Sequence, residues 1–224
     1  MYKDYSWKFD EPVASEFDSH VRQSVPMYEE FHKQIQNICR YYIEDGTNVV
    51  DVGTSTGEFF SNMKLNRKCQ YIGIDTEFYM IRKAQEKLQD KPVRLEIANI
   101  LDYNISNCSV INMMLTLQFI KPKDKQRAID NIYNALNKGG VLLLTDKVRS
   151  SHTEINDIYN DLYYDFKLEN NLSYKDVILK NISLRGVQKT ITLEENIDIL
   201  TKAGFSKIDV FMKCNNFVGI IAIK

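Results

Sequence analysis

The sequence has little of what marks several specialised classes of protein. Its 224 residues include four cysteines, four prolines, three histidines and one tryptophan, and the formal net charge is −1. The cysteines are scattered and form no C-x-x-C pair, which predicts reduced thiols in a cytoplasmic protein and excludes a disulfide framework. The histidines lack the spacing of metal ligands, so no metal site is predicted.

Long apolar runs and an excess of charge of one sign are also missing. No run approaches the ~20 apolar residues of a membrane helix, and the N-terminal stretch "MYKDYSWKFDEP" has no apolar core like that of a signal peptide. A nearly balanced charge gives no electrostatic case for broad nucleic-acid or membrane binding. We therefore expect no membrane association and no nucleic-acid partner, and a single domain over residues 1–224.

The chain does have an alternation of short apolar strands and amphipathic helices. Seven runs rich in Val, Ile or Leu are predicted strands: Asn48–Val52, Gln70–Ile74, Val93–Ile97, Val110–Leu115, Val141–Thr145, Ile208–Met212 and Val218–Ile223. Helical patterns separate the first five, which favours a parallel sheet covered on both faces. Only "KCNN" joins the last two, so they are predicted to pair as an antiparallel hairpin at the sheet's edge.

Helical segments are predicted both between the strands and outside this alternation. Those between the strands cover residues 77–88, 124–140 and 192–205, the second ending at Gly139-Gly140 and the third at Gly204. Two further segments, at 12–42 and 153–184, are not assigned to the sheet. They predict a helical lid or cap within residues 1–44 and a helical insertion within residues 150–190. The fold class is therefore α/β and Rossmann-like.

The turn after the first predicted strand is the strongest functional signal. In "DVGTSTG", Asp51, Gly53 and Gly57 lie at the carboxyl edge of the expected parallel sheet, where open α/β sheets bind ligands. Glycine lets the backbone turn sharply and approach a ligand without a Cβ atom in the way. A helix starting near Thr56 would also point free N–H groups at that space.

An acidic residue ends the next strand. Asp75 in "YIGID" lies about twenty residues beyond the turn, where a carboxylate can accept hydrogen bonds from both hydroxyls of a ribose. The turn lacks the last glycine of G-x-G-x-x-G, which a dinucleotide's pyrophosphate needs. The pattern therefore favours S-adenosyl-L-methionine, with S-adenosyl-L-homocysteine as product. In the alternative interpretation, the glycines only shape a turn and Asp75 caps a helix near Glu77. That interpretation explains each feature on its own, but not their occurrence together on successive strands.

Longer stretches resemble the carboxy-S-adenosyl-L-methionine synthase family of the tRNA wobble-uridine pathway. From about Trp7 onward, "WKFDEPVASEFDSHVRQSVPMY" is similar to the family's W-x-F-D-E-x-V-A-x-x-F and R-S-V-P-x-Y, and "DVGTSTG" resembles its D-L-G-C-S-L-G. "LTLQFIKP", "YYDFK" and "TKAGF" follow in the family's order. The resemblance implies a class I methyltransferase fold, a homodimer, and conversion of S-adenosylmethionine and prephenate into carboxy-S-adenosylmethionine.

The residue pattern and the resemblance together place the cofactor contacts. These are expected at Tyr28, Asp51, Gly53, Thr54, Ser55, Gly57, Asp75, Thr76, Asn99, Ile100 and Met114. Two of these positions depart from the family, which has an acid at Asn99 and an asparagine at Met114. Asn99 can still bond adenine, and Asn112 faces the same side of its strand as Met114 and could replace the missing amide.

A third departure concerns the group transferred. The family's arginine that holds the added carboxylate is Asn181 here, and a charge-assisted bond is worth ~1.5–3 kcal/mol. Either the chain no longer makes or binds the carboxylated product, or another cation has replaced that arginine. Arg185, one helical turn further on, is the candidate; Lys180 is placed behind it because its direction differs. The alternative for Arg185 is a solvated surface charge.

No catalytic residue is assigned, because methyl transfer from a sulfonium depends mainly on alignment. His152, Tyr164 and Arg185 are weak candidates, with Tyr163 and Asp165 as further possible bases, and each has an alternative as a surface or packing residue. Trp7, Phe9, Phe17 and Tyr28 are predicted to form a lid that excludes water from the cofactor, the alternative being that they cover the sheet's edge.

Three functions follow from these observations. The first is an S-adenosylmethionine-dependent methyltransferase acting on a small molecule. The second is a carboxy-S-adenosylmethionine synthase, or a user of its product. The third is a cofactor-binding partner protein without turnover.

Overall fold

The computed structural model describes residues 7–224, and seven strands there form one sheet in the order β3-β2-β1-β4-β5-β7-β6. The strands are β1 (Asn48–Val52), β2 (Gln70–Asp75), β3 (Val93–Ile97), β4 (Cys108–Met114), β5 (Leu136–Lys147), β6 (Lys207–Cys214) and β7 (Phe217–Ile223). The first five are parallel, and β7 is antiparallel to both β5 and β6. This confirms the predicted mostly parallel sheet with an antiparallel C-terminal hairpin.

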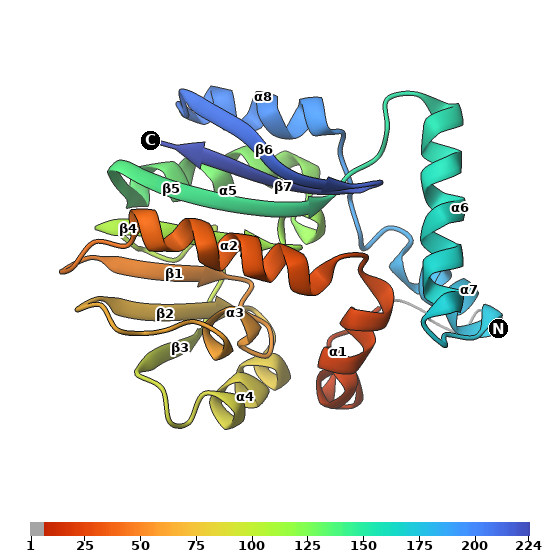
Figure 1. The fold of residues 1–224 in the computed structure, drawn as a ribbon, viewed down its shortest axis with the longest axis horizontal. Coiled ribbons are helices and arrows are strands. Elements are labelled where there is room, and N and C mark those ends of the chain that lie inside the picture. Colours follow the sequence, from red (N-terminus) through yellow and green to blue (C-terminus); the bar gives the residue numbers. More distant parts are fainter. Residues whose placement is uncertain (1–6) are drawn as a thin grey trace.

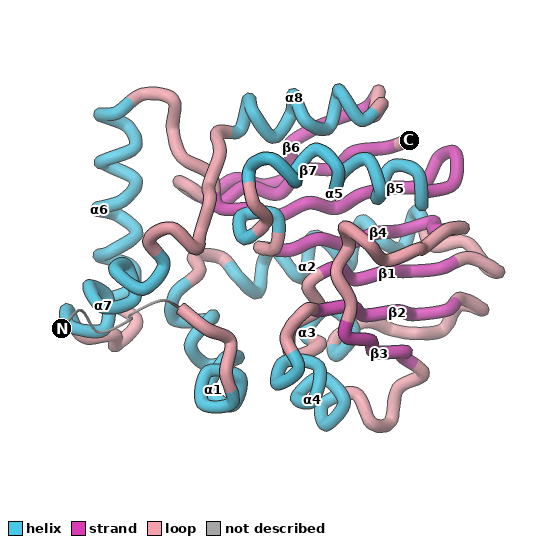
Figure 2. The backbone as a smooth tube through the Cα atoms, turned by 180° about the vertical axis from the view of Figure 1, so that it is seen from behind, coloured by secondary structure: helices cyan, strands magenta, loops and turns pink. Residues whose placement is uncertain are grey.

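Helices cover both faces of the sheet and its carboxyl edge (Figures 1 and 2). They are α1 (Glu11–Ser24), α2 (Tyr28–Tyr42), α3 (Glu58–Ser61), α4 (Phe78–Lys87), the 3₁₀ helix η1 (Leu117–Phe119), α5 (Pro122–Ala135), α6 (Thr153–Glu169), α7 (Tyr174–Leu184) and α8 (Leu193–Ala203). In Figure 1, α2 lies across one face of the sheet, and Figure 2 shows α5 and α8 over the other.

The core is divided by the sheet because successive strand residues point to opposite faces. In β1, Val49 packs in the cluster that contains Ile35 of α2, whereas Val50 packs with Ile129 of α5 and Leu200 of α8. All five side chains are fully buried. Both faces of β1 are thus buried, as its nearly continuous apolar run predicts.

Helices α1, α6 and α7 lie beyond the carboxyl ends of the parallel strands (Figure 1). This confirms helices in the N-terminal segment and in the insertion after β5; residues 1–6 of the predicted lid or cap lie outside the described residues. The N-terminal segment is fastened to the insertion, because the Trp7 amide donates to the Ser183 carbonyl at 3.0 Å. The sheet's ligand-binding edge is therefore covered.

Two predicted helix boundaries are wrong. Helix α5 ends at Ala135 instead of at the glycine pair, because Leu136 already pairs with Cys108 in the sheet. The helix after the glycine turn begins at Glu58 instead of near Thr56, and it has only four residues. The predicted end of α8 at Gly204, with φ of 112°, is confirmed.

The described part of the chain contains no helix that combines the length and the hydrophobicity of a membrane span.

Candidate functional site

A cavity of about 1010 Å³ lies at the carboxyl edge of β1, β2 and β4, between the sheet and the helices α1, α6 and α7. Small-molecule sites usually enclose roughly 300–1,000 Å³. The volume leaves space for a nucleoside-containing cofactor and a second small molecule. All but one of the predicted cofactor residues line this cavity, namely Tyr28, Asp51, Gly53, Thr54, Ser55, Asp75, Thr76, Asn99, Ile100 and Met114.

The glycine turn forms the floor of the cavity with a backbone that only certain residues can adopt. Gly53 has φ of 74°, and a Cβ atom on it would lie 2.1 Å from Oγ1 of Thr116. The Thr116 hydroxyl bonds the carbonyls of Val52 and Met114, which holds it against the turn. Gly57, the remaining predicted contact, lies beneath the turn against Leu88, so it shapes the loop without facing the cavity.

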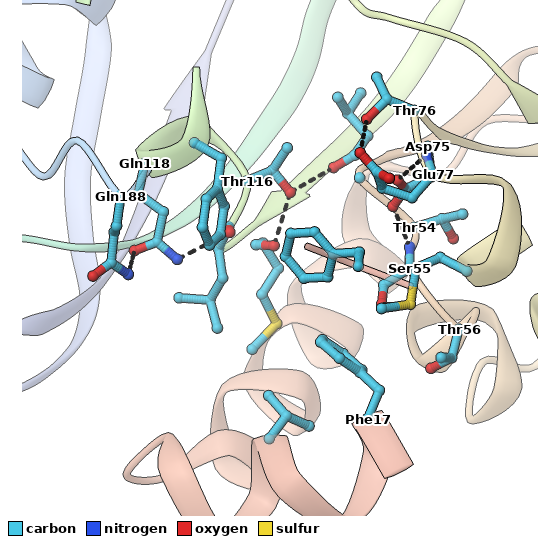
Figure 3. Close-up of a pocket in the computed structure, with 18 of the residues that line it drawn as sticks. Phe17, Thr54, Ser55, Thr56, Asp75, Thr76, Glu77, Thr116, Gln118 and Gln188 are labelled. Carbon is cyan, nitrogen blue, oxygen red and sulfur yellow. Dashed lines mark hydrogen bonds between the residues drawn. The ribbon is translucent and has the colours of Figure 1, made fainter. Parts of the chain in front are cut away.

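Ser55 occupies the middle of the turn with φ of 50°. Its amide donates to Oδ2 of Asp75 at 2.8 Å, as Figure 3 shows, and its hydroxyl contacts the sulfur of Met80. A left-handed backbone costs a side-chain-bearing residue of order 1 kcal/mol. The bond to Asp75 offsets that cost and joins the turn to the tip of the next strand.

Asp75 is oriented by two backbone amides. Besides the Ser55 amide, the Glu77 amide donates to its Oδ1 at 3.0 Å. Burial raises the pKa of Asp75 above its ordinary value, although these backbone hydrogen bonds oppose the shift. Each carboxylate oxygen can accept more than one hydrogen bond, so the carboxylate retains acceptor capacity toward the cavity. This geometry suits a vicinal diol such as that of a ribose.

Asp51 and Asn112 form a buried polar pair on adjacent strands. The Asn112 amide donates to Oδ1 of Asp51 at 2.7 Å, and burial raises the pKa of Asp51 to about 6. The side-chain oxygen of Asn112 and the hydroxyl of Thr54 are buried without a partner in the described chain. Buried polar groups are normally satisfied, so these two atoms indicate that a ligand with polar groups belongs here.

The loop after β3 supplies one wall of the cavity. Ile100 is buried, while Asn99 is exposed and its side-chain oxygen accepts from the Leu101 amide at 3.0 Å. Its NH₂ group remains available to a ligand. Asn112 and Met114 both line the cavity, which agrees with the expectation that they face the same side of β4.

The four predicted lid aromatics all line the cavity. Phe9 packs against Trp7, Phe17 and Phe119 with ring centroids 5.6–6.3 Å apart. Tyr28 begins α2, is buried, and packs edge to face on His32 at 4.6 Å. Figure 3 shows Phe17 on its helix, below Ser55 in that view.

Two histidines for which the sequence predicts no role, His20 and His32, lie in the wall of the cavity. His32 is buried with both ring nitrogens unpartnered within the described residues, and burial lowers its pKa to about 4. His20 contacts the Ser24 hydroxyl at 3.2 Å, and burial together with the charges of Lys180 and Lys167 lowers its pKa to about 4. Both are neutral at pH 7 and can accept a hydrogen bond from a ligand.

The weak catalytic candidates are not brought to the cavity. His152 is exposed and precedes α6, because the chain leaves the sheet after Lys147. Arg185 follows the last residue of α7 with ψ of 127°, so the helical spacing that would align it with Asn181 is lost. It is exposed, and among residues 7–224 its guanidinium bonds only Asn181, whose own amide donates to the Tyr164 hydroxyl at 2.7 Å.

The cations at the site are lysines. Lys147 at the end of β5 and Lys180 on α7 line the cavity, and Lys167 on α6 is buried beside them. The Nζ atoms of Lys147 and Lys167 lie 4.0 and 3.9 Å from the centre of the Tyr163 ring, and that of Lys180 lies over Trp7. The placement of Lys180 behind Arg185 was therefore wrong.

Helical spacing from neighbouring apolar residues would have predicted that two of these lysines face inward. Lys180 lies three residues after the buried Val177 and four before Leu184, which lines the cavity. Lys167 lies four residues after Tyr163, the other buried residue of α6. Each lysine therefore belongs to the inward face of its helix.

The residues present fit S-adenosylmethionine. The close-approach glycine, the oriented carboxylate of Asp75 and the unpartnered polar atoms of Thr54 and Asn112 surround one end of the cavity. Within residues 7–224, no group of three metal-ligand side chains is found.

Comparison with known proteins finds a matching family and relatives that cover the whole chain or nearly all of it. Residues 49–140 match the family model of a methyltransferase domain. Carboxy-S-adenosyl-L-methionine synthase of Staphylococcus epidermidis is 43% identical over 226 residues, covering 100% of this chain and 99% of the relative. The Nautilia profundicola protein of the same name is 34% identical over 221 residues, covering 97% of this chain and 94% of the relative.

Solved structures agree on the fold. A Haemonchus contortus phosphoethanolamine N-methyltransferase in complex with S-adenosylhomocysteine is 15% identical with a TM-score of 0.66, covering 95% of this chain and 58% of that one. A Methanococcus maripaludis structure described as an S-adenosyl-L-methionine-dependent methyltransferase is 18% identical with a TM-score of 0.65, covering 100% and 97%. The chain therefore belongs to the carboxy-S-adenosyl-L-methionine synthase family, enzymes with the class I methyltransferase fold that use S-adenosyl-L-methionine.

Proposed function

We propose that this protein is a carboxy-S-adenosylmethionine synthase that uses a small organic acid, prephenate by resemblance, as the carboxyl donor. The observation that carries the proposal is Lys180, a cation that lines the cavity next to the position where the family's arginine is missing. The sequence alone favoured methyl transfer because Asn181 removed the expected cation. Lys180 immediately precedes Asn181 in the chain, and its ammonium group can provide the positive charge that pairs with the carboxylate.

The remaining residues suit the proposed reaction. When bound, S-adenosylmethionine supplies a methyl group that its sulfonium makes weakly acidic. Carboxylation replaces one hydrogen of that group: loss of CO₂ from prephenate sends the electron pair of the broken C–C bond into the ring and expels the ring hydroxyl, the hydroxide leaves as water with the methyl proton, and the carbon bonds to the CO₂. The lysines attract the acid, and the lid aromatics exclude water, which strengthens charge interactions inside the cavity. Asp75 fixes the nucleoside end.

Incubation with S-adenosylmethionine and prephenate tests the proposal. We expect a sulfonium product heavier by one carboxyl group in the mass spectrum, and none when prephenate is omitted. Unchanged S-adenosylmethionine in the presence of folded protein that binds it would contradict the proposal.

Methyl transfer to a small-molecule acceptor is the second candidate. It is favoured by Asn181, whose amide is tied to Tyr164 and offers no charge to a carboxylate. In that case S-adenosylhomocysteine would accumulate in the presence of an acceptor. The two functions thus leave different products from the same cofactor.

We also propose a homodimer in the cytoplasm. Helices α6 and α7 expose a set of large apolar side chains, namely Ile155, Ile158, Leu162, Tyr174, Ile178, Leu179 and Ile182. They recur at helical spacing on each helix and so form one apolar face per helix. A second copy of this chain is the occupant that the family resemblance implies. The four unpaired thiols suit a reducing compartment.

A further inference from the structure

Two buried side chains of opposite charge bracket one peptide group beside the cavity. The ammonium group of Lys125 on α5 donates to the carbonyl of Leu117. Oδ1 of Asp146 on β5 accepts from the amide of Gln118 at 3.2 Å. That carbonyl and that amide belong to the same peptide group of η1. The positive charge therefore lies at the carbonyl end of the peptide dipole and the negative charge at its amide end. We call Lys125 and Asp146 the charge clamp.

The charge clamp acts on the peptide more directly than its two members act on each other. Within residues 7–224 neither member takes part in an ion pair. Burial lowers the pKa of Lys125 and raises that of Asp146, and the charge of each partly opposes the shift of the other. Oδ2 of Asp146 has no hydrogen-bond partner in the described chain. Apolar residues of similar volume often stabilise a fold as well as buried charges do. Stability alone therefore does not account for the clamp.

The bracketed peptide follows a segment whose backbone is unfavourable. Leu115 has φ of 54°, a left-handed conformation that is costly for a residue with a side chain. Its amide donates to the Thr145 carbonyl at 2.6 Å. Thr116 comes next and lies against Gly53 of the cofactor turn. A segment in this conformation needs bonds that hold it, and the charge clamp supplies two of them.

Gln118 connects the bracketed peptide to the helical insertion. Its side-chain amide donates to the Leu115 carbonyl at 3.0 Å. Its side-chain oxygen accepts from the Gln188 amide at 3.0 Å, a bond drawn in Figure 3. Its backbone carbonyl accepts from the Lys189 amide at 2.6 Å. Gln118 and Gln188 both line the cavity. The wall between the sheet's edge and the segment after α7 therefore depends on where Gln118 is held.

We propose that Lys125 and Asp146 are positioning residues for the reaction in the cavity. They fix the peptide between Leu117 and Gln118 from both ends, and so hold the contact of Gln118 with Gln188. Hydrogen bonds to charged groups are roughly twice as strong as neutral ones, so two of them restrain the peptide more firmly than neutral partners would. Neither charged residue lines the cavity itself. Each acts through Gln118.

This inference goes beyond the proposed function, and a local measurement tests it without turnover. Hydrogen exchange of the full chain, followed by mass spectrometry, reports on the amides of residues 115–119 and 185–191. At pH 8 we expect Lys125→Met and Asp146→Asn each to speed exchange of residues 185–191 roughly tenfold to a hundredfold, the usual effect of losing one hydrogen bond to a charged group. The amides of β1 are the internal reference and should change less.

Matched variants separate positioning from a general loss of folding. Lys123→Met replaces an exposed lysine of the same helix and should leave the exchange unchanged. Gln188→Leu keeps both charges but removes the contact with Gln118, so it should speed exchange of residues 185–191 and leave residues 115–119 protected. The double variant Lys125→Met/Asp146→Asn leaves no unpaired buried charge. Because both bonds act on one peptide, its effect should be smaller than the product of the two single effects.

The dependence on pH supplies a readout that a purely steric role would not move. Burial raises the pKa of Asp146 to about 7, so protonation at lower pH removes one charge of the clamp. The charged group that faces Asp146 is Lys125 of α5; η1 contributes Gln118 and β7 places Val218 opposite it, and neither titrates. Wild type and Asp146→Asn, compared at equal pH, should therefore converge in exchange rate as the pH falls from 8 to 5.5.

Turnover supplies an independent readout. Asp146→Asn and Gln188→Leu should lower kcat while the KM for S-adenosylmethionine stays close to the wild-type value, because the glycine turn and Asp75 still bind the cofactor. Equal acceleration of exchange in β1 and in residues 185–191, or exchange unaffected by both single charge substitutions, would overturn the inference. So would exchange rates of wild type and Asp146→Asn that differ equally at every pH. Local acceleration supports it even if no carboxylated product forms, so the two proposals fail separately.

Discussion

At the residue scale, the cofactor turn uses its two glycines in different ways. Gly53 admits the close approach of Thr116, whereas Gly57 admits Leu88 from beneath. Both have positive φ, so each would be strained by any side chain. The turn between them is joined to Asp75 through the Ser55 amide. The site is therefore held by backbone geometry as much as by side chains.

Gly53→Ala is expected to destabilise the protein by about 2–4 kcal/mol, from about 1 kcal/mol of left-handed strain and about 1–3 kcal/mol of overlap with Thr116. Gly46→Ala is the matched control, since Gly46 has φ of 82° and a methyl group placed on it would have no neighbouring atom within 4 Å. Urea unfolding should show a loss of only about 1 kcal/mol for that control. Equal losses in the two variants would refute a special packing role for Gly53.

Asp75→Asn should weaken binding of S-adenosylmethionine roughly tenfold to a hundredfold, because the amide is a weaker acceptor for ribose hydroxyls and for the Ser55 amide. Trp7 is the sole tryptophan and lines the cavity, so its fluorescence reports ligand binding directly. Asp90→Asn, an exposed substitution, is the control. If Asp75→Asn binds S-adenosylmethionine with wild-type affinity, a hydrogen bond between Asp75 and the ribose hydroxyls is contradicted.

The cofactor side of the site could be predicted from the sequence, and the anion side could not. The glycines and Asp75 stand at strand ends, where chain order alone fixes their neighbours. Helical spacing marks Lys167 and Lys180 as inward-facing, but their approach to Lys147 depends on how α6 and α7 fold back at the carboxyl end of β5, a tertiary arrangement with no local signal. Arg185 was preferred for its helical spacing, which fails because α7 ends at Leu184.

At the scale of elements, α1 is fastened to the cofactor turn by a charged network. Glu58 accepts from Arg22 of α1 at 2.7 Å and from Lys87 of α4 at 2.9 Å. Asp18 of α1 also pairs with Lys87. Burial raises the pKa of Glu58, but the hydrogen bond and charge of Lys87 and the charge of Arg22 outweigh it, so the pKa is lowered overall. The network therefore holds the lid only while its carboxylates are ionised.

Glu58→Gln should lower the free energy of unfolding at pH 7 by about 1–3 kcal/mol, the usual worth of hydrogen bonds to a charged group. Because the folded pKa is depressed, this stability is fully present above the ordinary value of 4.5 and is lost as pH falls below it. Urea unfolding of both proteins at pH 7 and pH 4 measures the difference. A gap that widens at pH 4 would contradict the network.

Element boundaries were predictable where capping chemistry is local. The capping box of Thr192 and Glu195 and the αL Gly204 bound α8 as expected. The end of α5 was not predictable from its glycines, because the pairing of Leu136 with Cys108 draws the chain into the sheet three residues before them. Tertiary pairing there overrides the local signal of a helix C-terminus.

At the scale of the whole molecule, the alternation of strands and helices was enough to predict the sheet, since parallel neighbours need crossover helices. The way the two helical additions meet over its carboxyl edge was not predictable. Their contact, through the Trp7 amide and the Ser183 carbonyl, joins residues far apart in the chain. Because these segments meet, the glycine turn with Asp75 and the lysines Lys147 and Lys180 line one common cavity.

The apolar faces of α6 and α7 predict a homodimer. Ile158→Glu combined with Ile178→Glu places charges on both faces and should convert the dimer to a monomer in analytical ultracentrifugation. Glu substitution of the exposed Tyr41 on α2, outside this face, is the control and should leave the dimer intact. A wild-type protein that sediments as a monomer at all concentrations would contradict the prediction.

The most direct test of the account is the heat of binding of S-adenosylmethionine and S-adenosylhomocysteine to the folded wild-type protein. The cavity predicts saturable binding of both, with one site per chain. If neither compound gives a binding heat at two temperatures, while circular dichroism shows the folded protein, the assignment of the glycine turn and Asp75 to an adenosyl ligand is contradicted.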